Sequence, residues 1–97
     1  MLLDSPFTHG TAIDDAYQEA SLPQGVTRAR LKQIAAKHNC RDVARLHNRL
    51  RRGNHYAVGW IVNEHDGAIR LSGHHYLSGD REGKTLIRSR HGDKMFG

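Results

Sequence analysis

The sequence predicts an α+β fold in which two or three N-terminal helices pack on a C-terminal three-stranded antiparallel β-meander. Apolar residues recur with the 3.6-residue period of an amphipathic helix as far as Arg52. From His55 onwards the apolar residues alternate with period 2, as in a strand that has one buried face. Asp66-Gly67 then interrupts this alternation with a dipeptide that strongly favours a two-residue hairpin turn.

The 97-residue chain has the size of one small domain. We expect an N-terminal arm (1–10), a helical part (11–53), a sheet (54–90) and a mobile tail (91–97). Only 37% of the residues are hydrophobic, which predicts a modest core and is compatible with a homodimer that shares apolar surface. The single cysteine excludes an internal disulfide, and no apolar run has the length of a signal peptide core or a membrane span. We therefore expect a cytoplasmic protein that makes no membrane contact and carries no cofactor.

The first two helices are predicted from their capping residues and apolar spacing. Thr11 and Thr27 are each placed to cap a helix N-terminus, because a threonine hydroxyl can accept a backbone N–H of the first turn. Apolar positions at i, i+3, i+4 and i+7 follow, so we expect helices over about 12–20 and 28–38. Asn39 tolerates the left-handed conformation and is predicted to end the second helix.

A third helix is predicted over 41–52, where apolar and basic residues fall on opposite sides. The apolar side is formed by Val43, Leu46, His47 and Leu50. The other side carries a basic row formed by Arg41, Arg45, Asn48, Arg49 and Arg52. Like charges one turn apart each cost about 0.2–0.5 kcal/mol, so folding alone does not favour this row. Asp42 is the only acid between Cys40 and Gly53, which leaves the row without the carboxylates that an ordinary exposed helix intersperses.

The short connection between the second and third helices, about three residues long, fits two arrangements. One is an ordinary αα-hairpin. The other is a helix-turn-helix, because Ile34-Ala35 followed by Asn39-Cys40 is similar to the general pattern of a small residue ahead of a tight turn. In that second arrangement the hairpin around Asp66-Gly67 is placed to act as a wing.

The strand register is predicted by pairing residues outward from Asp66-Gly67. This register sets Val62 opposite Leu71, Trp60 opposite Gly73, Val58 opposite His75 and Tyr56 opposite Leu77. It turns Trp60 and His75 towards the core, and it turns His74 towards solvent beside Arg70 and Tyr76. After a second turn at 78–83, residues 84–90 are predicted to form the third strand.

The charge balance favours a polyanionic partner, with 15 Lys and Arg against 10 Asp and Glu and a net charge of +5. We therefore expect a small protein that binds DNA or RNA by contacting phosphates, as a regulator or accessory protein of a phage or mobile element. The predicted contact residues lie on the second and third helices: Arg28, Arg30, Lys32, Arg41, Arg45, Asn48, Arg49 and Arg52.

Two alternatives from other functional classes remain. A metal-independent ribonuclease toxin needs a general base, a general acid and a cation beside the scissile phosphate. The candidates for these roles are His74, Arg70 and Glu64. A non-catalytic inhibitor would instead dock the same basic residues on an acidic protein or a nucleoprotein complex. No catalytic motif occurs at a recognisable spacing, so we favour a binding protein over an enzyme.

Three possible metal ligands lie close together in the sequence: His38, Cys40 and His47. A structural zinc site usually shows two paired ligand motifs, and here no second pair is present. Both histidines also fall on the apolar stripes of predicted helices. We therefore expect no metal site.

Overall fold

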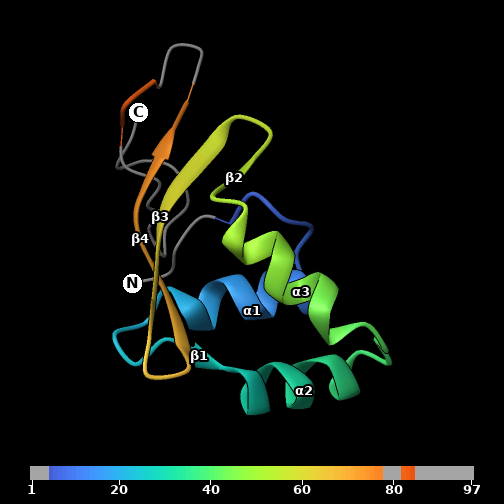
Figure 1. The fold of residues 1–97 in the computed structure, drawn as a ribbon. Helices are drawn as coiled ribbons and strands as arrows, with labels where there is room; N and C mark the ends of the chain where they lie inside the picture. Colours follow the sequence, from blue (N-terminus) through green and yellow to red (C-terminus); the bar gives the residue numbers. More distant parts are fainter. Residues whose placement is uncertain (1–4, 78–81, 85–97) are drawn as a thin grey trace.

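The computed structural model describes residues 5–77 and 82–84, and it confirms the α+β class. The helices are α1 (Ala12–Ala20), α2 (Arg28–Lys37) and α3 (Val43–Arg51). The strands are β1 (Val26–Thr27), β2 (Asn54–His55), β3 (Val58–His65) and β4 (Ala68–Tyr76). All three helices lie on one side of the β3–β4 hairpin (Figure 1). Within the described part of the chain, no helix is long and apolar enough to cross a bilayer.

The predicted caps of α1 and α2 are confirmed. The Thr11 hydroxyl accepts a hydrogen bond from the backbone N–H of Asp14 at 3.2 Å. The Thr27 hydroxyl accepts one from the backbone N–H of Arg30 at 3.1 Å. Asn39 follows the end of α2 with a φ of 55°, the left-handed conformation that asparagine tolerates better than most residues.

Helix α3 begins later than the sequence predicted, because Asp42 caps it. The carboxylate Oδ1 of Asp42 accepts a hydrogen bond from the backbone N–H of Arg45 at 2.9 Å. The predicted start at Arg41 is therefore wrong, since Arg41 lies ahead of the helix and outside its row of basic residues. The connection from α2 spans residues 38–42 and is longer than the expected three residues.

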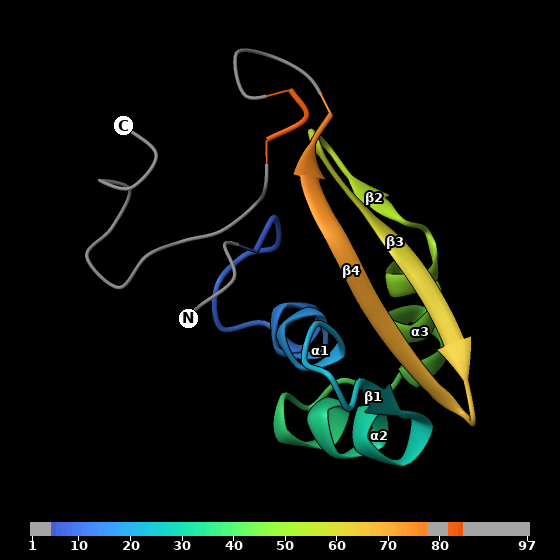
Figure 2. The ribbon, with the colours of Figure 1, turned by 90° about the vertical axis from the view of Figure 1, so that its left-hand side faces the viewer.

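The sheet has four antiparallel strands in the order β1-β4-β3-β2, rather than the predicted three. The two additional strands are two-residue segments at the edges: β1 pairs with β4, and β2 pairs with β3 (Figure 2). The predicted turn at 78–83 is described only at its end, where Glu82 bridges to Tyr76. The predicted third strand (84–90), apart from Lys84, and the predicted tail (91–97) lie outside the described residues.

The predicted first strand is interrupted. The pairs His55–Val58 and Asn54–Gly59 make residues 56–57 a two-residue loop between β2 and β3. Tyr56 takes the first loop position with a φ of 52°. The prediction that Tyr56 pairs with Leu77 is therefore wrong. Two strands therefore replace the expected single one.

The β3–β4 hairpin has the predicted turn, but its register changes along its length. Asp66 and Gly67 have φ values of 52° and 75°, as a type I′ turn requires. Val62 pairs with Leu71 as predicted. Beyond the next pair, Ile61–Ser72, the register shifts by one residue, so that Gly59 pairs with His75 and Val58 pairs with Tyr76. Gly73, with a φ of 59°, lies in the β-bulge that accommodates the extra residue of β4.

The bulge reverses the predicted orientation of the two histidines, because a one-residue slip turns each later side chain to the other face. His74 faces the helices, and its Nδ1 lies 2.6 Å from the hydroxyl oxygen of Tyr17 on α1. His75 lies on the outer face, where its Nδ1 is hydrogen-bonded to the Gly73 carbonyl. The predictions that Trp60 pairs with Gly73 and that His75 points to the core were therefore wrong.

The core lies between the helices and the inner face of the sheet, and Trp60 is one of its members. The indole is 5% exposed, which confirms its predicted burial, and its Nε1 donates to the Leu50 carbonyl at 2.9 Å. The rings of Tyr17 and Phe7 lie 5.0 and 6.0 Å from it, measured between centroids. Aromatic packing thus joins α1, the end of α3, β3 and the residues before α1.

Candidate functional site

Four of the predicted contact residues gather on the outward side of α3. They line one shallow hollow together with Asp42 and Ala44, and we call them the basic face of α3: Arg45, Asn48, Arg49 and Arg52. Arg45, Asn48 and Arg52 are exposed, whereas Arg49 is half-buried. Their spacing of i, i+3, i+4 and i+7 makes them neighbours on two successive turns.

Ion pairs with described residues do not balance the positive charge of this face. Among residues 5–77 and 82–84, no carboxylate forms an ion pair with Arg45, Arg49 or Arg52. The carboxylate nearest in sequence, Asp42, has an oxygen engaged in capping α3. Burial, and then the nearby charges of Arg49 and Arg52, lower the pKa of His55. An anion that approaches this face therefore meets guanidinium groups that form no ion pair within the described part of the chain.

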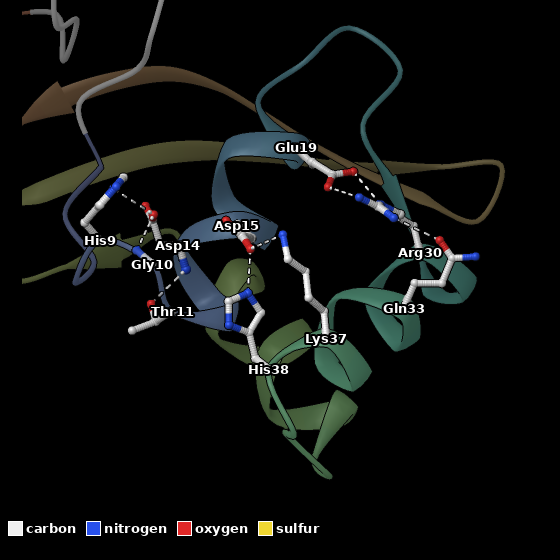
Figure 3. Close-up of polar contacts among 10 residues, drawn as sticks. All are labelled: His9, Gly10, Thr11, Asp14, Asp15, Glu19, Arg30, Gln33, Lys37 and His38. Atoms are coloured by element: carbon white, nitrogen blue, oxygen red, sulfur yellow. Dashed lines mark hydrogen bonds and ion pairs between the residues drawn. The ribbon is translucent and has the colours of Figure 1, made fainter.

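The predicted contacts on α2 do not extend this face. The Arg30 guanidinium donates to both carboxylate oxygens of Glu19 on α1, at 2.7 and 2.6 Å (Figure 3). Arg28 lines a different hollow, together with His47 and Arg51. His47 and Arg51 lie two residues after Arg45 and Arg49, or about 200° around α3, and therefore point to the opposite side of the helix. Lys32 is exposed on α2, and Arg41 is exposed ahead of α3. The structure thus brings together only part of the predicted contact set.

Arg51 has a structural partner instead of an open position. Its guanidinium donates to both carboxylate oxygens of Glu64 on β3, at 2.8 and 2.9 Å. The same carboxylate lies 3.3 Å from His47 Nε2. The hydrogen bond from Arg51 holds the pKa of Glu64 below its ordinary value, so this carboxylate stays charged and ties α3 to the sheet.

The three candidate ribonuclease residues are not brought together. Glu64 is paired with α3, and it lies opposite Ile69 on β4, five residues from His74, or about 16 Å along the strand. Arg70 precedes the bulge and lies on the other face from His74, with its Nε donating to the Pro23 carbonyl at 3.0 Å. His74 is half-buried, and burial lowers its pKa. These positions leave no shared space in which one phosphate could contact all three side chains.

The candidate metal ligands are engaged elsewhere. His38 Nε2 lies 2.6 Å from a carboxylate oxygen of Asp15, and this contact helps to join α2 to α1 (Figure 3). His47 contacts Glu64. Within the described part of the chain, no group of three or more His, Cys, Asp or Glu side chains is positioned to hold a metal ion.

A second hollow adjoins the basic face and contains aromatic residues that sequence reasoning did not assign to a site. We call it the aromatic groove; its lining includes Phe7, Arg45, Leu46, Arg49, His55 and Tyr56. Arg45 and Arg49 line both hollows, so the two surfaces are continuous. Phe7 belongs to the predicted N-terminal arm (1–10), and nothing in the sequence places it beside α3.

The rings of the groove are layered. The Phe7 and His55 rings are stacked, with centroids 4.5 Å apart and planes 26° from parallel. The guanidinium carbon of Arg49 lies 5.0 Å from the Phe7 centroid, in a cation–π contact. The Tyr56 ring meets His55 edge-on at 4.4 Å. Cationic and aromatic groups are therefore interleaved along one surface.

Comparisons of the chain with known protein families, with characterised proteins and with solved structures found no match.

Proposed function

We propose that this protein binds nucleic acid through the basic face of α3, with the guanidinium groups of Arg45, Arg49 and Arg52 contacting backbone phosphates. The supporting observation is that these three groups have no carboxylate partner among the described residues. By contrast, Arg30 and Arg51 are each paired with a glutamate through two hydrogen bonds. Like charges on one helix oppose folding, so their arrangement on a single face favours an anionic ligand.

The dimensions of the face suit a nucleic acid strand. From Arg45 to Arg52 the helix advances by about 10 Å, at 1.5 Å per residue. Over the same length of a DNA duplex, each strand presents about three phosphates, at 3.4 Å of axial rise each. Asn48, between the arginines, adds an amide that can both donate and accept hydrogen bonds. A small binding protein of this kind fits the predicted role of a regulator or accessory protein of a phage or mobile element, which remains a prediction.

The salt dependence of binding tests this proposal. Affinity for a fluorescently labelled oligonucleotide is measured by anisotropy at several salt concentrations between about 50 and 200 mM, where phosphate contacts dominate the dependence. The double variant Arg45→Ala/Arg52→Ala should bind more weakly. Its slope of log K against log salt should be less steep by about 1.8 on duplex DNA, or about 1.4 on a single strand.

A matched control removes the same charge from α2. Arg28 and Lys32 are exposed and lie away from the basic face, so Arg28→Ala/Lys32→Ala should change the slope far less. Equal effects of the two double variants would show that net charge, and not this face, governs binding. Absence of binding to DNA and RNA at low salt would refute the proposal and would make an acidic protein the class of partner to test next.

A further inference from the structure

Tyr56 has a conformation and an exposure that folding alone does not explain. The residue is 89% exposed, the highest value among the large hydrophobic residues that the structure leaves exposed. Its φ of 52° lies in the left-handed region, where Cβ crowds the following carbonyl oxygen. The first position of a two-residue hairpin loop with positive φ is usually occupied by glycine, asparagine or aspartate. A large aromatic residue here is therefore both strained and unused by the core.

Residues held in unfavourable backbone conformations occur preferentially where a ligand is bound. Tyr56 meets this expectation by its location, since it lines the aromatic groove, as Arg49 also does. The loop between β2 and β3 holds the ring at the surface, and His55 contacts it edge-on. The exposed ring thus shares the groove with Arg45 and Arg49, which form no ion pair with any described carboxylate.

The neighbours of the ring suit a flat apolar ligand that carries negative charge. Phe7 and His55 are stacked on each other, and Arg49 covers Phe7. Burial and the charges of Arg49 and Arg52 keep the pKa of His55 low, so its ring is neutral at physiological pH. Asp42, a carboxylate that also lines the groove, lies at the N-terminal end of α3. Arg49 and Arg52 lie near the other end, so a phosphate is favoured there.

We propose that Tyr56 is a stacking platform for an unpaired nucleobase, and that the aromatic groove together with the basic face of α3 selects single-stranded over double-stranded nucleic acid. This inference rests on the proposed function and names the class of its ligand. Aromatic rings stack on any exposed base, and stacking is tolerant of sequence. In a duplex, the faces of the bases are already covered by their neighbours, so only an unpaired base can use the ring of Tyr56.

The test compares one labelled oligonucleotide, single-stranded and annealed to its complement, at the same salt concentration. The wild type should bind the single strand more tightly than the duplex. Asparagine tolerates a positive φ, so Tyr56→Asn removes the ring without straining the loop. This variant should bind the single strand about 5- to 150-fold more weakly, the loss typical of one stacked base. It should leave duplex affinity and the salt slope unchanged, because no charge is removed. Tyr56→Phe should bind like the wild type, since the stacking face is retained.

Two further measurements separate this role from a structural one. Tyr56→Asn should unfold at a temperature no lower than the wild type, because the substitution relieves backbone strain at an exposed site. Leu22→Asn removes an exposed apolar side chain from the connection after α1 and should bind like the wild type. A lower unfolding temperature accompanying the loss of affinity, or an equal loss for single strand and duplex, would overturn the inference.

The inference and the proposed function can fail separately. If Tyr56→Asn binds the single strand as the wild type does while Arg45→Ala/Arg52→Ala still flattens the salt slope, the stacking platform is refuted and the phosphate contacts stand. If neither nucleic acid binds at low salt, both are refuted.

Discussion

Replacement of Trp60 by alanine should remove a large part of the stability of the fold. The indole is 5% exposed, packs against the rings of Tyr17 and Phe7, and donates a hydrogen bond to the carbonyl of Leu50. Truncation of a buried tryptophan to alanine typically costs about 3–5 kcal/mol. The substitution also removes the hydrogen-bond partner of a carbonyl in the last turn of α3, so the upper part of this range is expected. Small domains unfold at a cost of about 5–15 kcal/mol, so the loss amounts to about a quarter of the total or more.

Urea unfolding monitored by far-UV circular dichroism measures this loss. Circular dichroism replaces fluorescence because Trp60→Ala removes the only tryptophan of the chain. The matched control is Ile61→Ala, one residue further along β3, where the side chain is 61% exposed on the outer face. The control should change the free energy of unfolding by no more than about 0.5 kcal/mol, as is usual for exposed positions. A cost below about 1 kcal/mol for Trp60→Ala would refute this assignment of the sheet faces. Wild-type tryptophan emission at the wavelength of a fully hydrated indole would refute it as well.

The two histidines of β4 provide the remaining tests. His74→Ala removes the contact with Tyr17 and should cost about 1–3 kcal/mol in urea unfolding, whereas His75→Ala on the outer face should cost no more than about 0.5 kcal/mol. The opposite order of effects would support the unbulged register. Burial lowers the pKa of His74 below its ordinary 6.5, so the unfolded chain binds more protons than the folded one as pH falls below that value. The free energy of unfolding should therefore decrease below pH 6.5, and His74→Gln should reduce this decrease; a variant with the full wild-type pH dependence would contradict the assignment.

Local signals in the sequence were sufficient to predict the helices and the hairpin turn. The hydroxyls of Thr11 and Thr27 cap α1 and α2 as expected, and Asp66-Gly67 adopts the two positive φ values of its turn. These features depend on residues only a few positions apart, whose geometry is set by the local backbone. The start of α3 was also predictable, since aspartate is a preferred N-cap, but the arginine spacing gave more weight to Arg41 than to Asp42.

The bulge in β4 was not predictable from residue polarity. Register is normally recognised from the alternation of apolar and polar residues, and a slip exchanges the two sets. At His74-His75 the exchanged residues are identical, so the pattern is the same in either register. Gly73 was predicted to lie opposite Trp60, whereas in the structure its positive φ serves the bulge. The strands β1 and β2, of two residues each, are too short to show any periodicity.

The candidate site was predicted only where it lies on one helix. The spacing of Arg45, Arg49 and Arg52 along α3 can be read from sequence, because a helix brings residues i, i+4 and i+7 to one side. The pairing of Arg30 with Glu19 depends on how α1 packs on α2, and no local pattern contains that information. The same holds for the aromatic groove, whose rings come from segments about fifty residues apart.

The position of Phe7 has a practical consequence for any binding assay. This ring is buried under Arg49 and stacked on His55, so the residues ahead of α1 form one wall of the groove. A purification tag joined to Met1 begins six residues from Phe7. Six residues of fully extended chain span at most about 20 Å. A bulky or charged tag can therefore reach the groove and alter binding without any change in the folded protein. Untagged protein, or protein from which the tag has been cleaved, is the appropriate material for comparing variants of α3 and of Tyr56.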